Sequence, residues 1–182
     1  MKIHHLNCGT MRGLGLKPLN DTGGYIRPGL AVLHCLLIEA DGALVLVDTG
    51  WGLAAYRHPT RFERVFRRIV RSLDDEGETA LRQVEGLGCR PQDVTDIVVT
   101  HLHLDHAGGL RDFPAARVHV YAEEHRVATR DRTRFEGAHL LAHWAHGPDW
   151  ALHDLAEDDW FGYACTAPFT LGGAGRMIPP LR

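Results

Sequence analysis

The sequence lacks the charge and the long apolar segments that would point to nucleic acid or a membrane. Its 182 residues carry 20 lysines and arginines against 23 aspartates and glutamates, so no basic excess is available for polyanions. No apolar run approaches the roughly 20 residues that a membrane-spanning helix needs. The N-terminus, MKIHHLNCGT, has no apolar segment of signal-peptide length. We therefore expect a cytoplasmic protein whose partners include neither nucleic acid nor a membrane.

Cysteine is also scarce, and the four cysteines form no C-x-x-C pair. Their wide spacing predicts reduced, mostly buried thiols and argues against a disulfide framework or a structural zinc knuckle. The chain has no P-loop and no G-x-G-x-x-G after a strand, which argues against nucleotide binding. It also has no G-x-S-x-G elbow, which argues against a Ser-His-Asp hydrolase. Histidine, in contrast, occurs thirteen times.

The strand pattern indicates a mixed sheet in a single domain over residues 1–182. Lys2 to Leu6 predicts a short strand, and residues 9–29, with six glycines and two prolines, predict a long loop. Two apolar runs flank Asp41-Gly42 and predict a β-hairpin. The segments TDIVVT (95–100) and RVHVYA (117–122) predict two buried strands, and FGYACTA (161–167) is consistent with another.

Three helices are expected between and after these strands. The first begins with a capping box of Thr60 and Glu63 and has apolar residues at helical spacing: Phe62, Val65, Phe66, Ile69, Val70 and Leu73. The second runs from Glu78 to Leu87, with Gly88 as its stop. The third runs from Ala122 to Thr129 and opens with two glutamates. Residues 130–160 show no clear period. This order predicts the α/β (α+β) class, a mixed β-sheet with helices on one face.

The motif that carries chemistry is THLHLDHAGG, residues 100–109, which follows a predicted buried strand. Imidazole and carboxylate groups are good ligands for zinc and similar divalent metals. His101 and His103 are two residues apart, so in an extended backbone they point the same way. Asp105 and His106 follow at a turn, so one short loop would offer ligands to two adjacent metal ions. The alternative, a chance cluster on a solvated loop, agrees poorly with its place after a buried strand.

THLHLDHAGG resembles the His-x-His-x-Asp-His signature of the metallo-β-lactamase superfamily. Asp48, at the end of LVLVDTG, matches the strand-end aspartate of that superfamily, and HHLNCGTMR (4–12) resembles the start of its lactonase-like branch. The resemblance implies an αβ/βα sandwich with a metal pair, usually zinc, between two sheets. It also assigns the metal ligands: His101, His103, Asp105 and His106. Asp105 would in addition be catalytic, orienting water, and Asp48 would hold a ligand histidine by a hydrogen bond.

The function implied by this resemblance is hydrolysis, in which a metal-bound hydroxide attacks the carbonyl of a small lactone or ester. The family's further ligands, which begin with a histidine in a Gly-His-Thr-x-Gly-His segment, do not occur in the 182 residues. The chain therefore reads as the N-terminal lobe, truncated before the third ligand motif, with RMIPPLR resembling the strand that leads into it. The alternative function is a catalytically inactive lobe that binds metal weakly or serves only in association.

Two further expectations follow from the apparent truncation. His139, His143 and His146 are spaced so that they could replace the ligands of the second lobe, although the same region reads equally well as an aromatic lid. A sheet that lacks its partner sheet would expose an apolar face and unpaired edges. We therefore expect a weakly stable chain, or one that closes its core by self-association.

Overall fold

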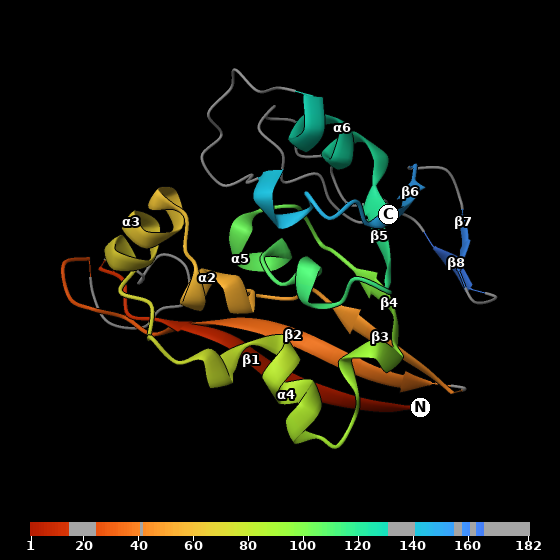
Figure 1. Ribbon diagram of the computed structural model, residues 1–182, viewed down its shortest axis with the longest axis horizontal. Helices are drawn as coiled ribbons and strands as arrows, with labels where there is room; N and C mark the ends of the chain where they lie inside the picture. The colour runs from red at the N-terminus through yellow and green to blue at the C-terminus, as the bar shows by residue number, and fades with distance from the viewer. Residues whose placement is uncertain (15–24, 41, 131–140, 155–157, 161–162, 166–182) are drawn as a thin grey trace.

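The computed structural model describes residues 1–14, 25–40, 42–130, 141–154, 158–160 and 163–165. Its main feature is a six-stranded sheet whose strands lie side by side in sequence order, with β1 at one edge (Figure 1). The strands are β1 (Lys2–Met11), β2 (Ala31–Ala40), β3 (Ala43–Val47), β4 (Val94–Val98), β5 (Arg117–Tyr121) and β6 (Asp149–His153). A separate antiparallel ribbon consists of β7 (Asp158–Trp160) and β8 (Tyr163–Cys165).

The sheet is mixed, as predicted. β1, β2 and β3 are antiparallel, and β3 to β6 are parallel. The predicted hairpin is confirmed, since Ala40 pairs with Ala43 and Gly42 has a φ of 84°, which suits a tight turn. Because β3, β4 and β5 run in one direction, the residues that follow these strands emerge at the same edge of the sheet.

Helices cover the face of the sheet that forms the core. They are α2 (Leu53–Arg57), α3 (Arg61–Ile69), α4 (Ala80–Gly86), α5 (Leu104–Ala107) and α6 (Ala122–Arg130), with 3-10 turns η1 (Glu76–Glu78), η2 (Pro91–Asp93), η3 (Leu110–Asp112) and η4 (Leu141–His143). Leu37, Leu46, Ile97 and Val118 are partners across four neighbouring strands and are at most 1% exposed. Side chains of α4, α6 and η3 join this row in one buried cluster. The predicted class, a mixed sheet with helices on one face, is confirmed.

The opposite face of the sheet carries the alternate side chains of the same strands. Leu36, Val47 and Val98 are partners on this face, and all three are partly buried. Self-association through this face stays a prediction, for which the oligomeric state in solution is the test.

The first strand is longer than predicted. β1 continues to Met11, so the interpretation of residues 9–29 as loop is wrong at its start. A bulge between Asn7 and Thr10 keeps the strand paired with β2, and Gly9 adopts a φ of 147° within it. The backbone of Gly9 packs against Trp51, whose ring would lie 2.3 Å from an added Cβ. Glycine is therefore required at position 9 both by the backbone angle of the bulge and by the close contact with Trp51.

The capping box of α3 is confirmed, but the apolar stripe is wrong in part. Thr60 Oγ1 accepts from Glu63 N at 3.2 Å, and Glu63 Oε2 accepts from Thr60 N at 2.7 Å. Val65 and Ile69 are 58% and 69% exposed, and the helix ends at Ile69. The buried residue of α3 is instead Glu63, because its Oε1 accepts a hydrogen bond of 2.9 Å from Nε2 of His143.

This buried pair predicts a specific acid sensitivity. Burial would raise the pKa of Glu63, but hydrogen bonds from His143 and Thr60 outweigh it and lower the pKa to about 2. A carboxyl group whose pKa falls on folding stabilises the protein above its unfolded pKa, near 4.5, and this contribution is lost as the pH falls towards 2. We expect a loss on the order of 2–3 kcal/mol over that range. Urea denaturation at several pH values measures it.

The control for this prediction is E63Q, because glutamine does not titrate. Other carboxylates also take up protons in acid, so the informative quantity is the stability of wild type minus that of E63Q. This difference should shrink as the pH falls from 5 to 2.5. A difference that is independent of pH would contradict the assignment.

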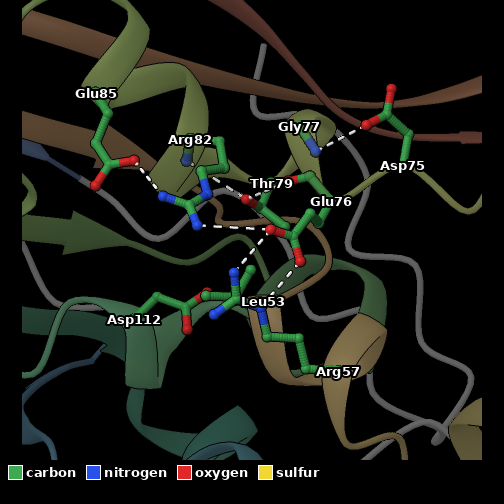
Figure 2. A network of polar contacts seen from close by, with 9 residues as sticks. All are labelled: Leu53, Arg57, Asp75, Glu76, Gly77, Thr79, Arg82, Glu85 and Asp112. Carbon is green, nitrogen blue, oxygen red and sulfur yellow. Dashed lines mark hydrogen bonds and ion pairs between the residues drawn. The ribbon is translucent and has the colours of Figure 1, made fainter.

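The second predicted helix is confirmed as α4, which begins at Ala80, two residues later than predicted. Thr79 separates η1 from α4, since its side chain accepts from Arg82 N at 3.4 Å and begins a new helix. Gly88, with a φ of 80°, follows the end of α4 as predicted. Figure 2 shows that Glu76 joins Arg57 of α2 and Arg82 of α4 through ion pairs of 2.8 and 3.5 Å. These side chains are partly exposed, so the pairs contribute little to stability.

The sequence does not predict β6 in the region 130–160, because its residues, DWALH, include no β-branched side chain. It becomes a strand by pairing with β5, where Trp150 is the partner of Val118. The strand expected in FGYACTA is confirmed as β8. His139 and RMIPPLR lie outside the described residues. Cys8 and Cys35 are buried, Cys89 is partly buried, and all three are free thiols.

In the described part of the chain, every helix is too short or too polar to cross a bilayer.

Candidate metal centre

The histidine loop, residues 100–109, follows β4 at the edge of the sheet where the parallel strand β3 also ends. Asp48 directly follows β3, and its N–H donates to the carbonyl of Val98, the last residue of β4, at 2.9 Å. The chain then runs through Thr100 to His103, and α5 begins at Leu104. Residues from two strands therefore meet at one edge of the sheet, and sequence reasoning identified both.

The four predicted ligands lie together. The ring centroids of His101 and His103 are 4.4 Å apart, and those of His101 and His106 are 4.0 Å apart. Asp105 Oδ2 is 3.8 Å from Nε2 of His106. Leu102, between the first two histidines, is fully buried. The turn predicted for the second pair is in fact the short helix α5.

Asp48 holds this loop in place. Its Oδ1 accepts from Thr100 N, and its Oδ2 accepts from Thr100 Oγ1 and from Nδ1 of His106, each at 2.8 Å. Asp48 is 4% exposed and has a left-handed φ of 57°, which is uncommon for a residue with a side chain. Because Nδ1 of His106 donates to this carboxylate, the neutral ring keeps the lone pair of Nε2 for a metal.

Thr49 adds a second link that the sequence did not reveal. Its Oγ1 donates to the carbonyl of His106 at 2.9 Å and accepts from Gly109 N at 3.0 Å. Its position beside Asp48 in LVLVDTG was the available signal. Asp48 and Thr49 together fasten both ends of the segment 100–109.

The pKa values of His101 and His106 are shifted in opposite directions by their surroundings. Burial lowers the pKa of His101 to about 4, and the neighbouring His106 and His103 contribute to the decrease. Burial also acts against protonation of His106, but the hydrogen bond and charge of Asp48, with the charge of Asp105, raise the pKa of that ring. His101 is therefore neutral at neutral pH, the state in which imidazole binds a metal.

The residues fit a divalent metal by their chemistry: three imidazoles and one carboxylate, with one ring already oriented by a buried aspartate. As the side chains stand, no three His, Cys, Asp or Glu residues of the described segments are arranged to hold an ion. The three rings instead contact one another directly. The donor atoms therefore suit a divalent metal, and the side chains would take up their coordinating arrangement when the ion binds.

Histidines outside the loop have other contacts. His143, considered as a substitute ligand, is bonded to Glu63, and His146 is exposed. His4 is hydrogen-bonded to Glu39, and His119 is hydrogen-bonded to Asp96. Among the histidines that the structure describes, His101, His103 and His106 are the three whose rings gather in one loop beside a carboxylate, that of Asp105.

Comparison with known proteins gives the class of this fold and site. The family model of the metallo-beta-lactamase superfamily matches residues 29–162, which is more than half of the chain. The chain therefore belongs to the metallo-beta-lactamase superfamily. A probable metallo-hydrolase of Mycobacterium tuberculosis is 39% identical over all of this chain and 54% of its own length. An N-acyl homoserine lactonase of Bacillus cereus is 33% identical over 52% of this chain and 38% of its own length.

Solved structures agree on the fold. A quorum-quenching N-acyl homoserine lactone lactonase superposes with a TM-score of 0.62 at 20% identity, covering 84% of this chain and 57% of its own. The dizinc quorum-quenching lactonase AidC gives a TM-score of 0.59 at 18% identity, covering 86% and 59%. The chain spans about half the length of the curated relatives that it matches along its whole length.

Proposed function

We propose that this chain provides the histidine loop of a metal-dependent hydrolase that opens a lactone or ester bond in a small molecule. The observation that carries the proposal is the three-fold bonding of Asp48, which fixes Thr100 and His106 beside His101 and His103. A buried carboxylate is costly unless it is hydrogen-bonded, and the three hydrogen bonds of Asp48 also orient a ligand histidine. The lactonase relatives and the dizinc neighbour support the choice of bond and of zinc.

The residues of the loop have distinct roles in this proposal. His101, His103, Asp105 and His106 would hold zinc, two ions in a complete site. When bound, zinc lowers the pKa of water to about 7 and so supplies a nucleophile at neutral pH. Asp105 would also orient the water and take up its proton, and Asp48 would keep His106 in the tautomer that offers Nε2. We further propose that residues 1–182 belong to one domain.

The test is zinc binding followed by turnover. We expect the wild-type chain to bind zinc, with NMR shifts confined to the rings of His101, His103 and His106, and to hydrolyse lactones or esters until a chelator is added. H103A should abolish stoichiometric binding. H58A is the matched control, because His58 is an exposed histidine outside the loop and should leave binding unchanged.

Two outcomes would contradict the proposal. Zinc that leaves the three rings unperturbed would exclude the loop as the metal site. Zinc binding without any turnover would favour the alternative, an inactive lobe that binds metal.

A further inference from the structure

Glu124 is a buried carboxylate that contacts the histidine loop, and its sequence pattern does not reveal this contact. It lies in the first turn of α6 and is 4% exposed. Its Oε1 accepts a hydrogen bond of 2.8 Å from the backbone N–H of Leu102. Its neighbour Glu123 is exposed and pairs with Arg126 on the same helix. Two adjacent glutamates that look alike in the sequence therefore have different environments.

Leu102 is the residue between His101 and His103, so its position sets the geometry of both rings. Its side chain is fully buried in the main core cluster, and its amide is bonded to Glu124. The residue between the two histidines is thus held at two points, by the packing of its side chain and by a hydrogen bond from its backbone N–H. Because the side chains of an extended segment alternate, fixing Leu102 directs His101 and His103 to the opposite side.

Burying the carboxylate of Glu124 costs free energy, so the contacts that offset this cost indicate a specific role for the residue. A buried charge is strongly unfavourable unless it is hydrogen-bonded. The bond to Leu102 N–H is charge-assisted, and the positive N-terminal end of α6 also favours an anion at Glu124. These contacts offset the cost, and they place the charge directly behind the loop.

The geometry assigns Glu124 as a positioning residue that holds the peptide between His101 and His103, and so sets how the two imidazoles meet a metal ion. This assignment rests on the proposed function of the loop. Metal–ligand distances tolerate only about 0.2 Å of error, so a loose peptide would weaken binding even with every ligand present. Asp48 fastens Thr100 and His106, and Glu124 fastens Leu102 between them.

The experiment compares E124M, which lacks an acceptor but keeps the volume, with E124Q, which keeps a neutral acceptor. Two quantities are measured: hydrogen exchange of the Leu102 amide in the metal-free protein, and the zinc dissociation constant. E124M should exchange at least tenfold faster at Leu102 and bind zinc on the order of 10–100-fold more weakly. E124Q should lie between E124M and wild type in both.

Two controls separate positioning from general stability. E123Q alters the exposed neighbour and should leave both quantities unchanged. V84A removes buried volume from α4, far along the chain from the loop, and should lower the melting temperature while zinc affinity stays at the wild-type value. If E124M does not fold, E124Q is compared with E123Q. The hydrogen bond from Leu102 N–H to the neutral amide of E124Q is weaker, so the Leu102 amide should exchange faster in E124Q than in E123Q.

The assignment is overturned if E124M matches E123Q in either quantity. Equal exchange would show that Glu124 does not protect the Leu102 amide, and equal zinc affinity would show that this hydrogen bond does not affect metal binding. Failure of the proposed function looks different. In that case wild type itself does not bind zinc through the loop, whereas faster exchange at Leu102 in E124M still reports the contact.

Discussion

Replacement of Asp48 by alanine should abolish zinc binding and destabilise the protein by about 3–5 kcal/mol, the range found when one partner of a buried ionic contact is removed. The carboxylate accepts three hydrogen bonds, from Thr100 N, Thr100 Oγ1 and His106 Nδ1. D48A leaves these three partly buried donors without their acceptor, which costs part of the desolvation of each. Urea denaturation and zinc titration measure the two effects on the same samples.

D48N separates the two effects, because asparagine keeps one oxygen for Thr100 but replaces the other with an NH2 group. That group would face Nδ1 of His106 and favour the tautomer with its hydrogen on Nε2, where a metal needs the lone pair. We expect D48N to retain most of the stability while losing zinc affinity on the order of 10–100-fold. Equal zinc affinity in D48N and wild type would show that the tautomer of His106 is not set by Asp48.

The parts of the site that the sequence predicts correctly are those with local patterns. The loop 100–109 is compact, so spacing alone brings the histidines together once the preceding strand is recognised. Asp48 is 52 residues from Thr100, yet it was found because LVLVDTG reads as a strand with an aspartate at its end. The same reasoning gave the hairpin at Gly42 and the capping box at Thr60, each defined within four residues of chain.

The parts that the sequence did not predict depend on contacts between distant segments. Glu63 lies among residues with a helical apolar pattern, but it is His143, 80 positions away, that makes it the buried member of α3. Glu124 looks like an ordinary first-turn glutamate until Leu102 is placed beside it. Strand β6 exists because β5 offers it an edge. In each case a tertiary contact decides the outcome, and the local sequence pattern does not show which distant residue or strand makes that contact.

Gly108 provides the sharpest case in which packing and local propensity predict opposite signs. Its dihedral angles, φ −61° and ψ −31°, are helical, so an exposed glycine with this backbone would gain stability on replacement by alanine. A Cβ at Gly108, however, would lie 2.5 Å from the carbonyl oxygen of Leu104 and 2.8 Å from that of Gly50. Both atoms belong to the backbone around the histidine loop and cannot turn aside. We expect G108A to destabilise the protein by about 3 kcal/mol or more and to abolish zinc binding.

The matched control is G86A, at the last residue of α4, where an added Cβ would meet no atom within 4 Å. Alanine there should be neutral or stabilising by up to about 1 kcal/mol, with unchanged zinc affinity. Chemical denaturation and zinc titration of both variants give the comparison directly. If G108A were as stable as G86A, the close approach of α5 to the end of β3 would be wrong. The pairing of Asp48 with His106 depends on that approach, so it would be wrong as well.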